Sequence, residues 1–305
     1  MNQQEAIHVH NLKKTYGKVT AIEAISFSVS RGELFGLIGP DGAGKTSIFR
    51  ILTTLLVPDE GIAHVESNDV IKNYRKIRKI TGYMPGRFSL YLDLTVQENL
   101  EFFATIFGTT IRDNYHLIKD IYQQIEPFKD RLAGNLSGGM KQKLALSCAL
   151  IHKPSILVLD EPTTGVDAVS RREFWEMLIK LKQQGITILV STPYMDEASM
   201  CDRVGLIQNG KMLTIDSPAS ILHAFPEKLF SVKAQNTYQL LLDLRKRADL
   251  RSVYPFGSTV HIAGKEQTPD LSSMEKYLWE RGHEDVQIAA ITPTIEDCFM
   301  ELMKS

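Results

Sequence analysis

The chain has 305 residues, of which 43% are hydrophobic and 23% are charged, an ordinary balance for a globular protein. Its formal net charge of -1 excludes a chain-wide attraction to nucleic acid or acidic lipid, and its three cysteines form no CxxC pair that would indicate a zinc site. No apolar run reaches the roughly 18 residues of a membrane-spanning helix, and the N-terminus lacks signal-peptide features, so we expect any membrane role to need a separate partner chain.

The first elements predicted along the chain are strands. Apolar residues alternate with polar ones at 7–9 and 27–29, which is typical of half-exposed strands. The apolar run Leu34–Ile38 predicts a buried strand that ends in a glycine-rich loop. Apolar residues at helical spacing from 48 to 56 then predict a helix, which we expect Pro58 to end.

The middle of the chain is predicted to be mainly helical from about residue 88 to 154. Thr95-Val-Gln-Glu98 has the pattern of a capping box at a helix start. Ile156–Leu159 predicts a buried strand, 174–181 an amphipathic helix, and 186–190 another buried strand. Strands that alternate with helices favour an α/β fold with a largely parallel sheet, covered on both faces.

The last part of the chain contains a hairpin signal and a domain boundary. Asn209-Gly210 lies between two apolar runs, and both residues tolerate the positive φ of a tight turn. Pro218 and Pro226 flank the expected boundary. Residues 227–305 mix strand-like and helical runs, which predicts a small α+β appendage.

The segment Gly39-Pro-Asp-Gly-Ala-Gly-Lys-Thr46 matches the P-loop pattern and has the strand before it and the helix after it that the pattern requires. Glycines let backbone N–H groups turn toward phosphate oxygens, and the helix N-terminus adds partial positive charge. We expect Lys45 to neutralise phosphates and Thr46 to bind Mg²⁺. The predicted nucleotide contacts in this region are Gly39, Pro40, Asp41, Gly42, Ala43, Gly44, Lys45, Thr46 and Ser47.

Two acidic residues, Asp160 and Glu161, end the second buried strand. Asp160 is predicted to bind Mg²⁺, and Glu161 to act as the general base that polarises the attacking water. Adjacent acids at a strand end can also be solvated turn residues. The P-loop elsewhere in the chain favours the catalytic interpretation.

The segment Leu136-Ser137-Gly138-Gly139-Met140 precedes a predicted helix. Its glycines can expose backbone amides at a helix N-terminus, which is a second anion site. Two phosphate-binding loops in one chain suggest that two copies sandwich ATP, each covering the P-loop of the other. A Ser-Gly-Gly turn by itself would be an ordinary loop.

With the P-loop, LSGGM and LVLDEP in this order, the sequence resembles the ATP-binding subunits of ABC transporters over about residues 5–220. The resemblance implies a P-loop NTPase with a RecA-like core, an antiparallel β subdomain and a helical subdomain at about 88–154, within a domain spanning 1–226. It also implies ATP and Mg²⁺, a membrane permease, and a second ABC ATPase subunit in a hetero- or homodimer. The expected location is the cytoplasmic face of the cell membrane, as a peripheral subunit.

Several family roles follow from matching positions. Tyr16, in Lys-Thr-Tyr-Gly, matches the aromatic residue that stacks on adenine, and Gly165-Val-Asp167 matches the loop that touches the dimer mate. The resemblance implies that Ser137 and Gly139, with Gly138, contact the γ-phosphate bound by the opposite subunit. Gly-Tyr-Met-Pro and the tail Pro293-Thr-Ile-Glu-Asp-Cys-Phe299 resemble drug-exporter-type bacterial subunits. The tail could also be a generic amphipathic helix.

Two positions depart from the family pattern. Gly86 stands where the family has a glutamine that approaches Mg²⁺ and the attacking water, and Pro193 stands where it has a histidine that donates to the γ-phosphate. Proline has no donor. We therefore hypothesise that the chain binds ATP but hydrolyses it slowly at its own P-loop, and completes a competent site on a different subunit. The alternative is an active homodimer that tolerates both changes.

Two other classes of function stay open at this stage. One is a soluble ABC ATPase of DNA repair or translation, although no coiled-coil insertion or second core is present. The basic stretch Tyr74–Lys79 could contact nucleic acid, but short stretches of this kind are usually solvated helix faces, so we expect no nucleic acid partner. The other is an ATP sensor that opens and closes without turnover.

Overall fold

The computed structural model describes residues 5–87, 90–225, 228–265 and 269–304. The chain forms two compact units, Met1–Pro218 and Ala219–Ser305. The boundary expected at 226/227 falls on residues outside the described ranges. The division lies earlier, so that almost all of helix α7 (Pro218–His223) belongs to the second unit.

The first unit contains an antiparallel sheet with the strand order β2-β1-β4-β5, which is the antiparallel β subdomain expected from the sequence. Strands β1 and β2 are longer than the short alternating runs predicted, because polar residues beyond those runs also pair along the hairpin, with several register shifts. The strands are β1 (Glu5–Tyr16), β2 (Val19–Ser30), β4 (Glu60–Val65) and β5 (Asn68–Asp69).

The central sheet has the order β10-β9-β3-β8-β7-β6 and is parallel except for the edge strand β10. Its inner strands are continuous apolar runs because both faces are buried. The carboxyl ends of β3, β8, β7 and β6 meet at one edge, where ligands bind in open α/β sheets. The strands are β3 (Leu34–Ile38), β6 (Thr81–Met84), β7 (Ile156–Asp160), β8 (Thr187–Thr192), β9 (Arg203–Gln208) and β10 (Lys211–Asp216).

The turn between β9 and β10 confirms the hairpin prediction, since Asn209 and Gly210 adopt φ values of 48° and 75°. The helix after the P-loop is shorter than predicted. It is α1 (Lys45–Leu52), so the expectation that it runs to Leu56 and ends at Pro58 was wrong. Thr53 donates its hydroxyl to the Phe49 carbonyl (2.8 Å), and the next residue, Thr54, turns out of the helix with a φ of 65°.

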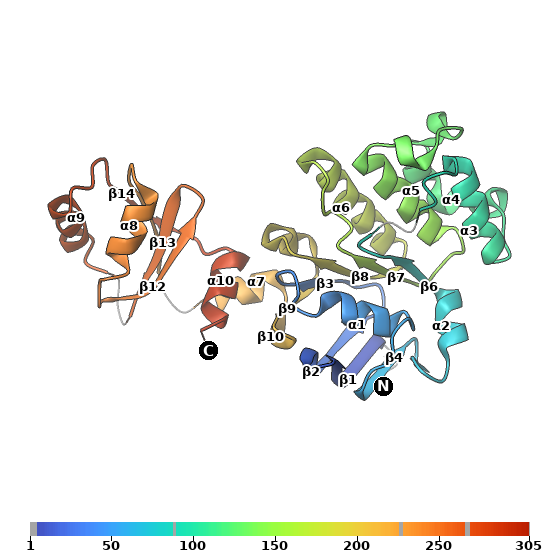
Figure 1. The fold of residues 1–305 in the computed structure, drawn as a ribbon, viewed down its shortest axis with the longest axis horizontal. Coiled ribbons are helices and arrows are strands. Elements are labelled where there is room, and N and C mark those ends of the chain that lie inside the picture. The colour runs from blue at the N-terminus through green and yellow to red at the C-terminus, as the bar shows by residue number, and fades with distance from the viewer. Residues whose placement is uncertain (1–4, 88–89, 226–227, 266–268, 305) are drawn as a thin grey trace. The chain divides into compact units, whose positions relative to one another are not determined.

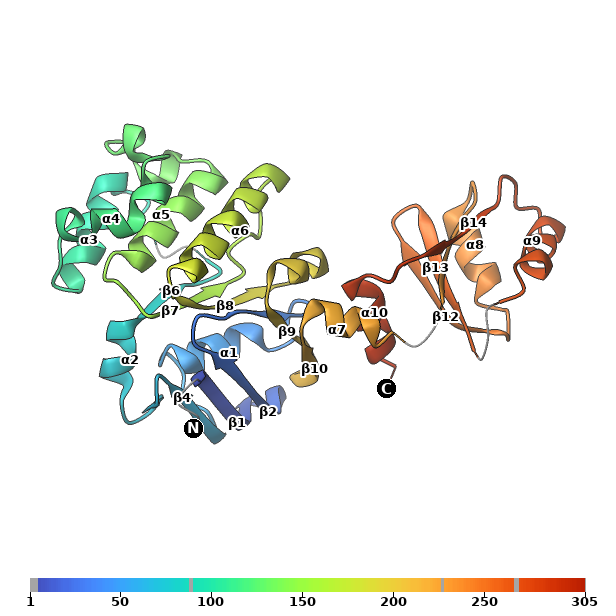
Figure 2. The ribbon, with the colours of Figure 1, turned by 180° about the vertical axis from the view of Figure 1, so that it is seen from behind.

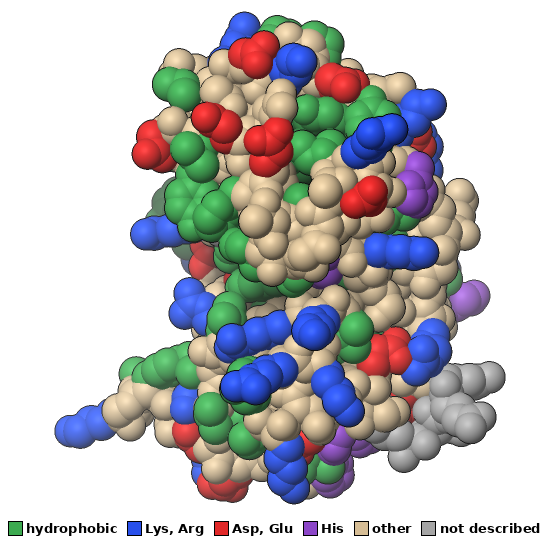
Figure 3. Space-filling view, turned by 90° about the vertical axis from the view of Figure 1, so that its right-hand side faces the viewer, with side chains coloured by type: hydrophobic (Ala, Val, Ile, Leu, Met, Phe, Trp, Pro, Cys, Tyr) green, Lys and Arg blue, Asp and Glu red, His purple; other side chains and the backbone are tan. Residues whose placement is uncertain are grey.

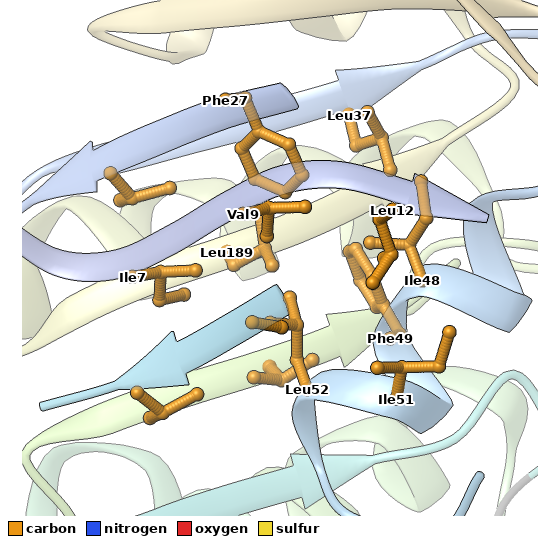
Figure 4. Packing of buried hydrophobic residues seen from close by; sticks show 14 of the residues in the cluster. Ile7, Val9, Leu12, Phe27, Leu37, Ile48, Phe49, Ile51, Leu52 and Leu189 are labelled. Carbon is orange, nitrogen blue, oxygen red and sulfur yellow. The ribbon is translucent and has the colours of Figure 1, made fainter. Parts of the chain in front are cut away.

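Helices cover both faces of the central sheet. The two ribbon views show α1 and the antiparallel sheet on one side and α5 and α6 on the other (Figures 1 and 2). Buried side chains of β1, β2, α1 and the central sheet form one core between the two sheets (Figure 4). The capping box is confirmed at the start of α3, where the Thr95 amide donates to Glu98 (2.7 Å) and the Glu98 amide donates to Thr95 (3.1 Å).

The predicted helical region contains α3 (Val96–Ile106), α4 (Ile111–Tyr122) and α5 (Gly138–Leu150), and its first two residues, 88 and 89, lie outside the described ranges. The other helices of this unit are α2 (Tyr74–Ile80) and α6 (Ala168–Gln183).

The second unit is the α+β appendage that the sequence predicted. Its antiparallel sheet has the order β12-β13-β11-β14, and α8 and α9 share a buried core with it. The tail helix α10 is tied to the sheet by His261 and Asp297, whose Nδ1 and Oδ1 are 2.8 Å apart. The elements are β11 (Leu229–Lys233), α8 (Thr237–Leu244), β12 (Leu250–Phe256), β13 (Thr259–Gly264), α9 (Leu271–Glu280), β14 (Gln287–Ile291) and α10 (Ile295–Leu302).

Candidate functional site

The P-loop joins β3 to α1 and forms a hollow at the carboxyl edge of the central sheet. The hollow is lined by Ala21, by the run Gly42–Ser47 and by Glu161. Helix α1 begins without a side-chain cap and without an acidic residue in its first turn. Its free N–H groups and partial positive charge therefore face the hollow, which is the arrangement that binds phosphate.

Two glycines are required where the loop meets other backbone. A Cβ on Gly39 would lie 2.0 Å from the Ile207 carbonyl oxygen. A Cβ on Gly44 would lie 2.3 Å from the Ala21 carbonyl oxygen, and the φ of Gly44 is +105°. Both positions therefore exclude a side chain. Pro40 and Asp41 are exposed, and Ala43 is buried beneath the loop.

We expect Gly44→Ala to destabilise the protein much more than Gly42→Ala. Gly42 has a φ of +78°, and a Cβ at this position would have nothing within 4 Å, so alanine there costs only backbone strain of about 1–3 kcal/mol. Alanine at position 44 would add a steric clash with the Ala21 carbonyl oxygen to a similar backbone strain. Urea unfolding of the two variants measures the difference, and equal midpoints would contradict the assignment.

Lys45 is buried at the base of the hollow. Its ammonium group donates to the carbonyl oxygens of Gly39 (2.7 Å) and Pro40 (3.0 Å) and lies 3.1 Å from the Glu161 carboxylate. The lysine is thus the positive charge that faces the hollow beside the predicted base. The structure places the two residues together, although the sequence separates them widely.

Asp160 and Glu161 follow one another at the end of β7 but have different surroundings. Asp160 is 2% exposed and accepts a hydrogen bond from the Ser191 hydroxyl (2.7 Å). The Glu161 amide donates to the same hydroxyl (2.9 Å), and Glu161 adopts a φ of 49° that turns its side chain toward Lys45. Burial, with the charge of Asp160 nearby, raises the pKa of Tyr83 to about 12, so this neighbour stays neutral.

The residues present suit Mg²⁺. Thr46 lines the hollow and offers a hydroxyl oxygen. Asp160 does not line the hollow but directly precedes Glu161, which does, and offers a carboxylate oxygen. In the described part of the chain, no group of three or more His, Cys, Asp or Glu could form a cage around a metal ion. Mg²⁺ is the ion that binds through one or two protein oxygens and completes its shell with water and phosphate.

The two departures from the family pattern lie at the same edge of the sheet. A Cβ on Gly86 would lie 3.2 Å from the Asp160 carbonyl oxygen and 3.9 Å from its Oδ2. A side chain at this position would therefore reach the predicted Mg²⁺ ligand. Pro193 directly follows Thr192, the last residue of β8, and offers no donor there.

Tyr16, the predicted adenine contact, lies beside the start of α1. The residue is 45% exposed and its hydroxyl is 3.3 Å from the Ser47 hydroxyl. An exposed aromatic face next to a phosphate loop can stack on a base. The structure brings Tyr16 and Ser47 to the rim of the hollow, and the adenine contact itself stays a prediction.

The signature loop lies apart from the P-loop hollow. Ser137 caps α5 by accepting from the Met140 amide (3.3 Å), and Ser137, Gly138 and Gly139 are absent from the lining of the hollow. A Cβ on Gly139 would lie 2.7 Å from the Ser170 hydroxyl, and one on Gly138 would lie 3.6 Å from the Gly165 carbonyl. Within one chain the signature thus packs on the Gly165–Asp167 loop and leaves the P-loop uncovered.

Sequence reasoning missed two buried polar residues that organise the site. One is Ser191, which ties the ends of β7 and β8 together through Asp160. The other is Glu197, which is 4% exposed and accepts from Thr163 (3.2 Å) and Thr192. Glu197 lies in the short 3-10 helix Met195–Met200, where only it and Ala198 are buried, and no sequence pattern marks which acid of this segment turns inward.

Comparison with known proteins gives consistent results. Residues 22–164 match the family model described as ABC transporter. The Nod factor export ATP-binding protein I of Rhizobium sp. (strain N33) is 34% identical over 304 residues, which cover 97% of this chain and 96% of that protein. The probable multidrug ABC transporter ATP-binding protein YbhF of Escherichia coli (strain K12) is 38% identical over 93% of this chain, which spans only 49% of the length of YbhF.

Solved structures resemble about 70% of the chain. An ATP-binding subunit of an ABC transporter superposes with a TM-score of 0.66 at 26% identity, over 72% of this chain and 93% of that one. A dimeric bacterial ABC transporter cassette gives a TM-score of 0.63 at 25% identity, over 69% and 98%. Among the residues that the structure describes, no helix is both long and apolar enough to cross a bilayer.

Proposed function

The chain belongs to the ABC transporter family, and we propose that it is an ATP-binding subunit that powers export through a separate membrane permease. The observation that carries the proposal is the P-loop hollow, which brings Lys45 and Glu161 together beside the space for phosphate. The relatives named for Nod factor export and for multidrug transport support export as the direction.

We assign the site residues as follows. The amides of the P-loop and Lys45 bind the phosphates of ATP, and Tyr16 stacks on the base. Thr46 and Asp160 would hold Mg²⁺, which neutralises phosphate charge when bound. Glu161 orients the attacking water as general base. Ser191 keeps the carboxylate of Asp160 in place through its hydrogen bond.

A second copy of an ABC ATPase completes the site. Because the signature loop of one chain lies outside its own P-loop hollow, the exposed Ser137 and Gly138 are free to cover the hollow of a partner subunit, with the buried Gly139 following them in α5. Their amides at the start of α5 then face the γ-phosphate from the opposite side. We propose an ATP-dependent dimer on this basis, with Asp167 at the contact between the mates.

Turnover at the chain's own P-loop is proposed to be slow. Removing one donor that stabilises a transition state typically costs about 10²–10³ in rate, and this chain lacks two such side chains, at Gly86 and Pro193. The intact signature can still serve a partner whose P-loop site has both. This favours a heterodimer with a more complete homologue.

The permease is proposed to dock in an apolar groove between α3, α5 and the β6 edge of the central sheet. Exposed apolar side chains stand at this groove, among them Leu55 (57% exposed), Ile106 (60%) and Phe107 (37%). Contiguous apolar surface of this kind marks protein interfaces. The location follows: the subunit lies at the cytoplasmic face of the cell membrane, held there by its permease.

A steady-state ATPase assay on the purified chain tests the slow-site proposal. We expect it to bind a fluorescent ATP analogue, to dimerise with ATP, and to hydrolyse ATP only slowly. Fast turnover that Glu161→Gln abolishes, without any partner, would contradict the proposal and favour the active homodimer. ATP-driven dimerisation with no turnover in any pairing would favour the sensor.

Co-expression with the permease encoded nearest to this chain tests the transport role. We expect the two to co-purify, and Ile106→Asp in the groove to weaken that association. Glu176→Lys on the exposed face of α6 is the control and should retain the permease. Salt-sensitive DNA binding without permease association would support the soluble ATPase instead.

A further inference from the structure

A basic segment in the first unit has no role in nucleotide binding. From Ile71 to Arg87 the sequence contains no acidic residue, in a chain whose formal net charge is only -1. Most of its cations lie on or next to α2 and are exposed. We call them the α2 basic face, which consists of Lys72, Arg75, Lys76, Arg78 and Lys79.

The α2 basic face is turned to solvent as a group. Figure 3 looks onto the side of the molecule that carries α2 and shows Lys and Arg side chains gathered there, with hydrophobic side chains between and above them. Ile77 is the buried residue that anchors the helix. The positive charge is therefore presented outward by a short, firmly attached element.

No acidic side chain within the described residues forms a salt bridge with the α2 basic face. The side-chain hydrogen bonds of this face are to uncharged groups: Arg75 donates to the Tyr74 hydroxyl (3.1 Å), and Arg78 donates to the Thr54 hydroxyl (2.8 Å) and carbonyl (3.0 Å). Asp69 is the nearby acid: its carboxylate accepts from the Lys72 backbone amide (2.9 Å). Both guanidinium groups also lie over the Tyr74 ring. The two arginines are thus held in position by these contacts, and the five cations of the face outnumber the one nearby acid, Asp69.

Apolar side chains are interspersed with these cations. Ile71 is 52% exposed, Tyr74 39% and Leu55 57%. Arg78 and Leu55 both line the apolar groove proposed for the permease, so the basic face and the groove are continuous. A mixture of aromatic, aliphatic and cationic side chains is typical of surfaces that lie at the membrane–water interface.

We propose that the α2 basic face binds the headgroups of anionic phospholipids at the membrane surface beside the permease. The placement beside the permease rests on the proposed function, whereas the charge complementarity does not. Each Lys or Arg held near an anionic leaflet strengthens binding by about fivefold, and the effect acts within a Debye length of about 10 Å. The face would orient the subunit while the groove engages its partner.

Nucleic acid is the other polyanion that could bind cations. The exposed Ile71 and Leu55 side chains favour the lipid, because a bilayer can bury aliphatic groups beside its headgroups whereas a phosphate backbone cannot. The short length of α2, seven residues, also offers little to enter a groove of duplex DNA.

Vesicle sedimentation with the full chain tests the proposal. We expect binding to phosphatidylcholine vesicles that contain phosphatidylglycerol, weak binding to vesicles without it, and a fall in affinity as salt rises. Changing Lys72, Arg75, Lys76 and Lys79 together to Gln should weaken binding by about 10²-fold or more. Arg78 is left in place because it also contacts Thr54 and the groove.

The matched control removes the same number of exposed positive charges from the second unit, by changing Lys228, Lys233, Arg245 and Lys265 to Gln. We expect it to bind vesicles as the unchanged chain does. Equal loss in both variants, or equal binding to vesicles with and without phosphatidylglycerol, would overturn the proposal. Tighter binding to a DNA duplex than to the vesicles, lost with the α2 changes, would overturn it in favour of nucleic acid.

The same proteins are assayed for binding of a fluorescent ATP analogue and for unfolding by urea. The α2 variant should keep both unchanged, since none of its changed residues lines the P-loop hollow. A chain that binds vesicles but no nucleotide would refute the proposed function and leave the lipid site standing. A chain that binds nucleotide but no vesicles would refute the lipid proposal and leave the proposed function standing.

Discussion

Lys45→Met is expected to weaken ATP binding by about 10²–10³-fold, the range found when one partner of a buried charge pair is removed. The lysine is 3% exposed and its ammonium group lies 3.1 Å from the Glu161 carboxylate. Without it, Glu161 would face the phosphates of ATP with no compensating charge between them. Lys45→Met therefore removes the attraction between the ammonium group and the phosphates, and it leaves the repulsion between the Glu161 carboxylate and the phosphates uncompensated.

Titration with a fluorescent ATP analogue measures the effect of Lys45→Met. Lys211→Met is the control, since that side chain lies on β10, is 62% exposed and pairs only loosely with Glu23 at 3.5 Å. It should bind ATP like the unchanged chain. If Lys45→Met bound ATP within a few-fold of the control, the P-loop would not be the phosphate site. A double change with Glu161→Gln should recover part of the lost affinity.

Short sequence patterns correctly predicted the elements whose conformation depends on a few neighbouring residues. The Asn209-Gly210 turn, the Thr95 capping box and the buried strand Leu34–Ile38 all formed as expected. In each case a few neighbouring residues determine the conformation, through positive φ, a reciprocal side-chain hydrogen bond, or an unbroken apolar run. The P-loop belongs to the same class, because its glycines and its flanking elements lie within one short segment.

The parts that sequence reasoning missed depend on residues far apart in the chain. The end of α1 was placed too late because its apolar spacing continues to Leu56, while the backbone leaves the helix at Thr54. Ser191 reaches Asp160 only because β7 and β8 are neighbours in the sheet. No pattern in the sequence specifies that pairing, so the hydrogen bond that orients the predicted Mg²⁺ ligand had to come from the structure.

The interpretation of Gly86 depends on both the sequence and the structure. The resemblance to the family predicted that a side chain is missing there, and the structure shows what such a side chain would meet. A Cβ at this position would lie 3.2 Å from the Asp160 carbonyl oxygen, a tight approach that a small shift of the segment can relieve. A glutamine at this position is therefore sterically feasible and would point toward the catalytic edge of the sheet.

We expect the double change Gly86→Gln with Pro193→His to raise the turnover of the isolated chain by about 10²–10³-fold, because each change restores a polar side chain of the kind whose loss costs that factor in other enzymes. Each single change should give a smaller gain, since both groups serve one transition state and their effects are not additive. ATP binding should change little, because Lys45 and the P-loop amides stay in place.

Steady-state kcat at saturating ATP is the measurement. Adding Glu161→Gln to the double variant should abolish the gain, which would show that the new turnover uses the chain's own base. A double variant that binds ATP and dimerises but hydrolyses no faster would contradict the idea that these two positions limit the site. The barrier would then lie in how the signature loop of a mate covers the P-loop. The kcat of the double variant therefore distinguishes two explanations of slow turnover: the absence of catalytic side chains at positions 86 and 193, and the absence of the proper partner subunit.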